Sequence, residues 1–191
     1  AALKPYLGVA DNTLYGTAGM NLGATHDARV ANLIEWVRGT EISGFRNRTL
    51  DGVTYRLGDI VHSTPVTVSK AVDNYHTLYA DQSYLTYWNA VKSRETMTYV
   101  GANDGMLHAF TNWKYGLDSQ ARPTYTKPSA APASERIGDE AWAFIPQAVL
   151  SHLKWPAHEN YTHTYLVDGR PRVFDAKILP DDTHYTDADA D

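Results

Sequence analysis

The sequence predicts a mainly β fold with two or three short helices. The first reason is the stretch Tyr99–Phe110, in which alternating apolar and polar residues flank the turn-forming run Ala102–Gly105. The second is a similar reversal at Asp168-Gly169, set between two apolar stretches. The third is composition: aromatic residues make up 12% of the chain, and aromatic side chains favour strands.

Bulk properties exclude several classes of protein. With 191 residues the chain can form one sizeable domain that buries about 70% of its unfolded surface. The net charge of −5 and the absence of a basic stripe give no support to nucleic-acid binding. The absence of cysteine excludes disulfides, thiolate metal sites and haem attached through Cys-x-x-Cys-His. No apolar run reaches the length of about 18 residues that would predict a membrane span.

The first half of the chain begins with a leading loop segment over residues 1–27, which does not have the pattern of a signal peptide. Asp27 is expected to cap a helix over 28–38, which carries its apolar residues on one face and ends before Gly39. Residues 40–58 contain an Asp51-Gly52 turn and three arginines, Arg46, Arg48 and Arg56. We expect these arginines to be solvated or paired with acidic residues, and anion binding is the alternative.

The segment before the central hairpin predicts strands and one helix. A strand over 59–69 is interrupted by Pro65, which cannot donate to a sheet ladder. His76–Ala80 is expected to be a short strand. Asp81 or Ser83 can cap a helix over 83–93. Tyr84, Trp88 and Val91 would share one face of that helix.

The segment after the hairpin begins with an exposed loop, predicted over about residues 112–140. Its run at 122–134 is rich in proline, alanine and serine, which cannot bury a core. A strand over 141–145 and a helix over 146–154 follow, and strands over 164–167 and 172–178 flank Asp168-Gly169.

Several motifs resemble segments of one family and occur in the same order as in that family. The C-terminal propeller of the PilY/PilC family has segments similar to Arg56–Val66, Val100–Phe110, Trp142–Pro146 and Tyr161–Gly169. These proteins are type IV pilus tip-associated adhesins and biogenesis factors of Gram-negative bacteria. The likeness covers roughly residues 30 to 178, and it implies a partial, incomplete β-propeller of the quinoprotein-like type. The chain departs from the family where about thirty residues replace a short turn after Phe110.

A weak internal repeat agrees with this architecture. Tyr99 and Tyr165, each followed by an Asp-Gly reversal, lie about 66 residues apart, and subtracting the insertion brings the spacing close to that of a propeller blade, roughly 40–50 residues. So few strands cannot close a ring. We therefore expect either a fragment of a longer polypeptide or a fold completed by a second chain. The expected organisation is a leading segment at 1–27, a partial propeller over 28–180 and an acidic tail at 181–191.

The resemblance implies a non-catalytic adhesin or assembly factor at the pilus tip or cell surface, extracellular or at the outer membrane. Its partners would be minor pilins and a host or surface receptor. The expected contact regions are the 112–140 loop and the Tyr84–Trp88 surface. The calcium site of the family lies beyond residue 191, so no calcium or other cofactor is expected in this chain.

The chemistry-bearing residues are predicted to be structural. No nucleophile elbow, zinc-binding helix motif or phosphate loop is present, so no catalytic residue is proposed. His62, His108 and His163 are expected to pack or to satisfy backbone groups, and Asp104 and Asp168 to form turns. The structural motif comprises Gly101, Asn103, Asp104, Gly105, His108, Asp168 and Gly169.

Two metal hypotheses have little pattern behind them. The tail residues Asp187, Asp189 and Asp191 resemble the start of an EF-hand loop, but its glycine and its distal glutamate are missing. His158, Glu159 and His163 lack the spacing of a ligand set.

Two other functions remain open. The strand-Asp-Gly-strand pattern also resembles blades of quinoprotein alcohol dehydrogenases, which hold pyrroloquinoline quinone and a metal. That likeness concerns the scaffold, and a scaffold does not imply an activity. The third possibility is a purely structural component of a surface filament, completed by another chain.

Overall fold

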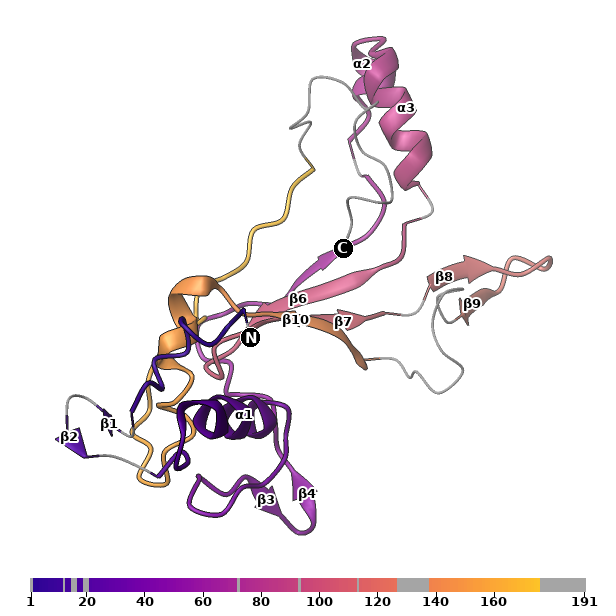
Figure 1. Ribbon diagram of the computed structural model, residues 1–191. Helices are drawn as coiled ribbons and strands as arrows, with labels where there is room; N and C mark the ends of the chain where they lie inside the picture. Colours follow the sequence, from indigo (N-terminus) through magenta and orange to yellow (C-terminus); the bar gives the residue numbers. More distant parts are fainter. Residues whose placement is uncertain are drawn as a thin grey trace. The chain divides into compact units, whose positions relative to one another are not determined.

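The computed structural model describes residues 2–11, 13–14, 17–18, 21–71, 73–92, 94–112, 114–126 and 138–175 (Figure 1). By its internal contacts the chain divides into two compact units. The first unit contains Ala1–Ser69 and Glu95–Pro171, and the second contains Lys70–Arg94 and Arg172–Asp191.

An antiparallel four-stranded sheet is the main element of the first unit. Its strands run in the order β10-β7-β6-β5. They are β5 (Val66–Val68), β6 (Met97–Gly101), β7 (Leu107–Thr111) and β10 (Glu140–Phe144). The predicted hairpin is confirmed, with Tyr99 opposite Ala109 and Gly101 opposite Leu107. Four strands are the size of one propeller blade, and the described part of the chain forms no closed ring of blades.

The hydrophobic core of this unit lies around helix α1 (His26–Val37). The helix is where the sequence predicts it, but its N-cap is Thr25, whose hydroxyl accepts a hydrogen bond from the Ala28 amide at 3.2 Å. The predicted cap, Asp27, instead pairs with Lys4 at 2.5 Å. The buried apolar side chains of the core come from the N-terminal segment, α1, the segment that follows α1 and residues 150–157; they are Leu7, Val9, Leu22, Leu33, Trp36, Phe45, Leu150, Leu153 and Ala157.

Three small hairpins complete the first unit. They are β1 (Thr13–Leu14) with β2 (Thr17–Ala18), β3 (Thr49–Leu50) with β4 (Val53–Thr54), and β8 (Lys114–Leu117) with β9 (Pro123–Thr126). The Asp51-Gly52 turn is confirmed, because both residues have positive φ, at 51° and 78°. The expectation of an irregular loop after residue 112 is wrong for residues 114–126, where a local hairpin satisfies the backbone.

The second unit contains α2 (Tyr75–Leu78) and α3 (Gln82–Val91). The prediction of a strand at His76–Ala80 is wrong. Ring contacts between α2 and α3 hold this segment in a helical turn, with the centroids of Tyr75 and Tyr84 5.1 Å apart. Asp81 caps α3 as expected, since its carboxylate accepts from the amides of residues 83 and 84 at 2.9 and 3.0 Å.

Other predicted elements are shorter or absent. Only Val66–Val68 of the predicted 59–69 strand pairs in a sheet. The predicted 146–154 helix is the 3-10 helix η1 (Gln147–His152). Residues 164–167 form no strand, because their backbone and side chains bond to other segments rather than to a ladder partner. Residues 172–175 are also not a strand, while 176–178 and the acidic tail with Asp187, Asp189 and Asp191 lie outside the described residues.

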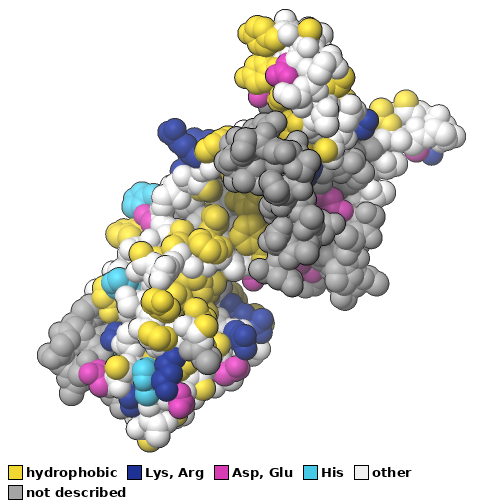
Figure 2. Space-filling model, turned by 45° about the horizontal axis from the view of Figure 1, so that its top comes forward, with side chains coloured by type: hydrophobic (Ala, Val, Ile, Leu, Met, Phe, Trp, Pro, Cys, Tyr) yellow, Lys and Arg dark blue, Asp and Glu magenta, His cyan; other side chains and the backbone are white. Residues whose placement is uncertain are grey.

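Apolar side chains gather in exposed patches on the face drawn in Figure 2. On the edge strand β10, Trp142 is 45% exposed and Phe144 is 57% exposed. Within the described residues, no helix has the length and apolar character needed to cross a bilayer.

Candidate functional site

The candidate site is built around the turn of the β6–β7 hairpin. The Ala102 amide donates to the Met106 carbonyl at 3.0 Å, and the Gly105 amide donates to the Ala102 carbonyl at 3.2 Å. Gly105 has a φ of +96°, which favours glycine because it has no Cβ to clash. The Asp104 carboxylate accepts from the Met106 amide at 3.1 Å, which confirms that Asp104 forms its own turn.

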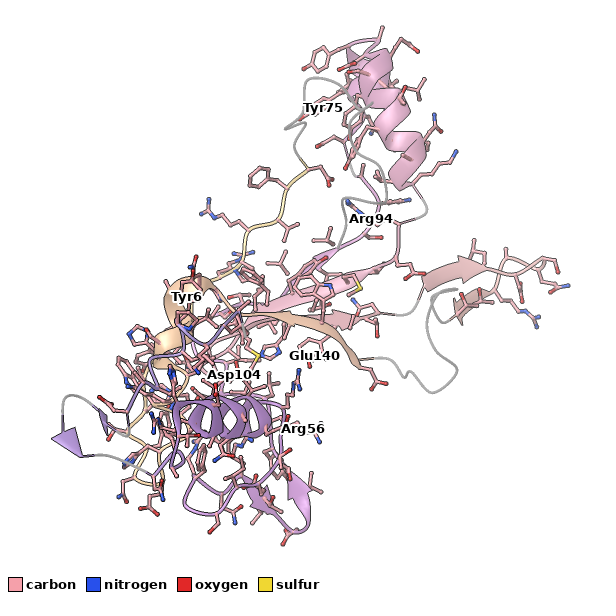
Figure 3. The ribbon with its side chains drawn as sticks, viewed as in Figure 1. Tyr6, Arg56, Tyr75, Arg94, Asp104 and Glu140 are labelled. Atoms are coloured by element: carbon pink, nitrogen blue, oxygen red, sulfur yellow. The ribbon has the colours of Figure 1, made fainter. Side chains whose placement is uncertain are left out.

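Asp104 also holds a neighbouring segment against this turn. Its other oxygen accepts from the Gly58 amide at 2.8 Å, and His108 Nε2 lies 3.0 Å from the same oxygen. Figure 3 shows Asp104 at the turn and Glu140 on β10. The carboxylates of these two residues bracket the His108 ring, whose Nδ1 lies 2.5 Å from Glu140. Asp104 therefore ties together residues separated by 46 positions.

Asn103 joins two further segments to the turn. Its amide donates to the Asp59 carbonyl at 3.0 Å, and its side-chain nitrogen donates to the Asp59 carboxylate at 2.9 Å. Its side-chain oxygen accepts from the Leu166 amide at 3.2 Å. Asn103 is only 2% exposed, so this residue, which the sequence marks as a turn former, is also a buried connector.

Three histidines pair with carboxylates in the same region, in four pairs. His108 pairs with Asp104 and Glu140, His163 with Asp59 at 2.8 Å, and His62 with Asp168. The expectation that these histidines pack or satisfy backbone groups misses their main partners, which are acidic side chains. Two of the pairs, His62 with Asp168 and His163 with Asp59, join residues more than 100 positions apart, and no local sequence pattern predicts them.

The pairs shift the pKa of three of these groups. Burial lowers the pKa of His108, but the hydrogen bonds to Asp104 and Glu140 outweigh burial and hold that pKa above its ordinary value. Burial raises the pKa of Asp59, but hydrogen bonds from Asn103 and His163 hold it below its ordinary value. Burial also raises the pKa of Asp168, but hydrogen bonds from His62 hold it below its ordinary value.

Close backbone contacts complete the network. A Cβ on Gly101 would overlap the carbonyl oxygen of Val167, so glycine is required for this approach. The Gly101 amide donates to the buried hydroxyl of Ser63 at 2.9 Å. Gly169 has open space around it, so nothing in the structure demands a glycine at that position.

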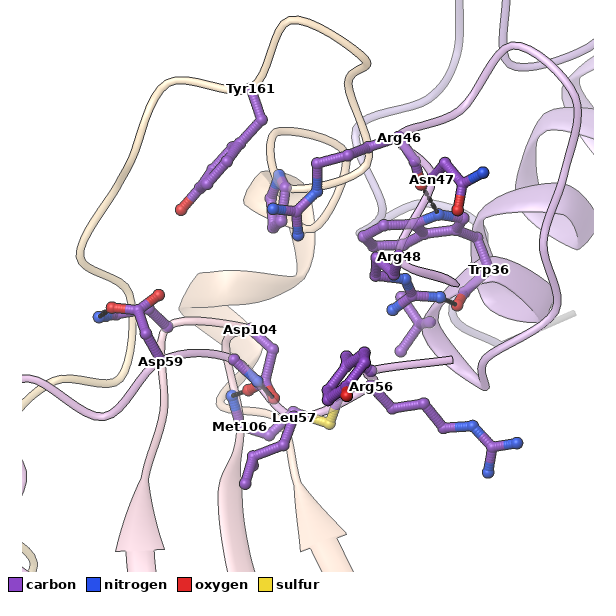
Figure 4. A pocket seen from close by; sticks show the side chains of 15 residues that line it. Trp36, Arg46, Asn47, Arg48, Arg56, Leu57, Asp59, Asp104, Met106 and Tyr161 are labelled. Atoms are coloured by element: carbon purple, nitrogen blue, oxygen red, sulfur yellow. Dashed lines mark hydrogen bonds between the residues drawn. The ribbon is translucent and has the colours of Figure 1, made fainter. Parts of the chain in front are cut away.

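A pocket of about 250 Å³ lies beside the turn (Figure 4). Its walls come from the end of α1, residues 46–48, residues 55–59, the hairpin turn and residues 156–161. The expectation that these arginines are solvated or paired with acidic residues is confirmed for Arg48, which lies 3.9 Å from Glu41, and is wrong for Arg46, which is half-buried and pairs with no described acidic residue. Arg48 stacks on Trp36, with its guanidinium carbon 3.6 Å from the ring centroid, and Arg46 lies over Tyr161 at 4.4 Å.

The arrangement of these groups favours binding over reaction. Asp104, Asp59 and Asp168 each accept hydrogen bonds from backbone or side-chain donors that hold segments together. Among the residues that the structure describes, no three histidine or acidic side chains are grouped so that they could hold a metal ion. His158, Glu159 and His163 are not brought together as such a group.

Comparison with known proteins identifies the family. A family model described as the PilY1 beta-propeller domain matches residues 57–186. The chain belongs to the PilY1 beta-propeller family. The match starts beside Gly58 and covers the turn, both strands of the hairpin and the segment around Asp168. The resemblance to the PilY/PilC propeller is thus confirmed.

Individual relatives carry consistent names. The Type IV pilus biogenesis factor PilY1 of Pseudomonas aeruginosa (strain PAO1) is 37% identical over 128 residues, which are 63% of this chain and 9% of that protein. The protein of the same name from strain UCBPP-PA14 is 34% identical over 159 residues, 78% of this chain and 11% of that protein. A PilY1 homolog of Xylella fastidiosa (strain Temecula1) is 30% identical over 160 residues, 76% of this chain and 9% of that protein.

The chain therefore spans about a tenth of the length of these PilY1 relatives. No solved structure matches it significantly. The pocket arginines Arg46, Arg48 and Arg56 precede the matched residues. The three arginines stand close together in the sequence, but Trp36 and Tyr161, the aromatic partners of Arg46 and Arg48, lie too far along the chain for any local pattern to show the pocket.

Proposed function

We propose that this chain is part of a type IV pilus-associated adhesin or assembly factor, acting as a non-catalytic binding scaffold. It would lie at the pilus tip or on the surface of a Gram-negative bacterium. The observation that carries the proposal is the PilY1 beta-propeller match, together with relatives that are named type IV pilus biogenesis factors. Minor pilins and a surface or host receptor are the proposed partners.

The side-chain chemistry of the hairpin turn supports a scaffold. Asp104 accepts from two backbone amides as well as from His108, and Asn103 bonds to both Asp59 and Leu166. Acidic and amide side chains engaged in this way hold loops in place and are poorly suited to exchange protons with a substrate. Rigid scaffolds of this kind commonly present binding residues on their loops.

The insertion after β7 is the first proposed contact region. Its stem is closed by the Gly138 amide, which donates to the Thr111 carbonyl at 3.0 Å, and by the Thr111 amide, which donates to the Asp139 carbonyl at 3.0 Å. Thr111 and Gly138, on either side of the insertion, therefore lie side by side at the sheet. The second proposed region is the Tyr84–Trp88 surface of α3, where Tyr84 and Trp88 are half-buried.

Replacement of the insertion tests this function. In the encoding bacterium, residues 114–137 are replaced by a short Gly/Ser turn, and a second strain carries a Gly/Ser segment of the original length. We expect both strains to retain the folded sheet and to lose adhesion, with surface pili still present if the role is adhesive. Loss of pili in both strains would indicate an assembly role, and unchanged pili and adhesion would refute the contact role of the insertion.

The sheet edges support a need for further blades. Strand β10 pairs only with β7 in the described sheet, and its five residues are all exposed, including Trp142 and Phe144. Exposed strand edges and apolar patches are normally covered in stable proteins. We propose that the remainder of the propeller or a second chain covers them. A compact, cooperatively unfolding monomer of the isolated 191 residues in size-exclusion chromatography would count against this.

The alternative function, a quinoprotein dehydrogenase, is tested by an enzyme assay. Addition of pyrroloquinoline quinone and an alcohol with a redox dye should give no dye reduction above that of the protein-free control. Cofactor-dependent dye reduction would overturn the non-catalytic proposal. A purely structural filament component would instead leave adhesion unchanged in both insertion variants.

A further inference from the structure

The pocket beside the hairpin turn contains a guanidinium group, that of Arg46, which makes no hydrogen bond or ion pair with a described residue. The backbone of Arg46 is fixed from both sides, because its amide donates to the Ala157 carbonyl at 2.9 Å and its carbonyl accepts from the Trp36 indole at 3.0 Å. Its guanidinium carbon lies 4.4 Å from the Tyr161 ring centroid and 5.8 Å from that of Trp36. The aromatic faces therefore hold the cation while leaving its N–H edge available.

Donors and acceptors in this pocket are unequally satisfied. The side chain of Arg46 makes no hydrogen bond or ion pair with any described residue, and its Nε is buried without a partner. The two acidic residues that line the pocket, Asp59 and Asp104, do have hydrogen-bond partners. Asp104 accepts from the amides of Gly58 and Met106. Asp59 accepts from Asn103 and His163. Because a buried unpaired donor is costly, the pocket needs an acceptor that the described residues do not supply.

The other two arginines play different roles. The Arg48 side chain is only 8% exposed, donates to the Trp36 carbonyl and lies 3.9 Å from Glu41, so its charge is already balanced. Figure 4 shows the Arg56 side chain extending away from Arg46. Arg46 is therefore the pocket's available cation. Burial lowers the pKa of Arg46, but an arginine guanidinium does not lose its proton in proteins, so Arg46 stays charged near neutral pH.

We propose that this pocket binds a carboxylate carried by a peptide, either an acidic side chain or a free C-terminus, through the guanidinium of Arg46. A planar guanidinium binds a carboxylate by two parallel hydrogen bonds. The volume of about 250 Å³ lies below the roughly 300–1,000 Å³ of pockets for drug-sized ligands, so it suits a single residue whose chain continues outside. The inference rests only on the residues of this pocket and does not depend on the proposed pilus role.

Three capped tripeptides test the proposal with the wild-type chain. One carries a glutamate side chain and an amidated end, one is all alanine with a free C-terminus, and one carries glutamine and an amidated end. Binding is followed by ¹⁵N NMR at the Trp36 indole N–H and the Arg46 Nε–H, with isothermal titration for affinity. We expect saturable shifts at both groups with one or both carboxylate peptides, and the first two peptides distinguish the two sources. No shift with either carboxylate peptide, equal binding of the glutamine peptide, or shifts confined to other residues would overturn the proposal.

Variants then test the role of the cation. Arg46→Met removes the charge while keeping a long apolar side chain, and Arg38→Met is the matched control, since the Arg38 side chain is 72% exposed. We expect Arg46→Met to weaken peptide binding about 10- to 100-fold, and Arg38→Met to change it less than about twofold. Arg46→Lys, which keeps the charge without the planar fork, should lie between them. Unchanged affinity in a folded Arg46→Met protein would contradict the proposal; if that variant does not fold, the wild-type shifts decide.

Discussion

Removal of the Asp104 carboxylate should destabilise the chain more than any ordinary surface change. In Asp104→Ala, three contacts disappear: those to the Gly58 amide at 2.8 Å, the Met106 amide at 3.1 Å and His108 Nε2 at 3.0 Å. The Asp104 and His108 side chains are only 12% and 6% exposed, so their contacts are poorly replaced by water.

The magnitude follows from these burials. A hydrogen bond to a charged group contributes about 1.5–3 kcal/mol, and breaking a buried pair typically costs about 3–5 kcal/mol. Met106 is half-buried, so water can replace its lost contact only in part, and His108 keeps Glu140 as a partner. We therefore expect a loss of about 3–4 kcal/mol in the free energy of unfolding, a large share of the roughly 5–15 kcal/mol of a typical domain.

Urea unfolding followed by tryptophan fluorescence, carried out on these residues together with the polypeptide that completes their fold, measures this loss. Glu159→Ala is the control, because Glu159 is exposed and makes no hydrogen bond or ion pair with a described residue, and it should stay within about 0.5 kcal/mol of the wild type. Asp104→Asn retains one acceptor oxygen and should fall between the two. A loss below about 1 kcal/mol in Asp104→Ala would refute the view that this carboxylate holds the Gly58 segment on the turn.

Three further predictions concern other parts of the structure. Gly101→Ala should lower the free energy of unfolding by about 1–3 kcal/mol, because the new Cβ would overlap the Val167 carbonyl. Gly169→Ala is the control, because Gly169 has open space around it, and urea unfolding of the two variants should show little change for it. The pKa of His108 is raised above 6.5 in the folded state, so its stabilising contribution is full below pH 6.5 and is lost as the pH rises through the raised value. The free energy of unfolding, measured across pH, should fall over this range in the wild type. The same fall should be missing in His108→Gln. Burial and the nearby Asp175 carboxylate raise the pKa of Tyr87 to about 12. An absorbance titration of tyrosinate should therefore include a late step that Asp175→Asn shifts towards 10.0.

Local sequence patterns were enough to predict the elements that form from residues close together in the sequence. The β6–β7 hairpin could be predicted because turn residues and strand alternation lie within a dozen positions, and α1 because its apolar spacing repeats every turn. The strand predicted at His76–Ala80 failed because aromatic contacts with α3 outweigh local propensity. The family itself was readable from the sequence, since its motifs are short segments in a fixed order.

Only the tertiary structure decided what the polar residues do. Asn103 and Asp104 are identifiable as turn formers from sequence, but their bonds to Asp59, Gly58 and Leu166 join positions that are 44 to 63 residues apart. The pocket around Arg46 likewise needs Trp36 and Tyr161, which approach only when α1 and residues 156–161 pack beside the turn. Sequence spacing specifies conformation over a few residues, whereas burial and long-range hydrogen bonds, which set these functional properties, exist only once the chain has folded.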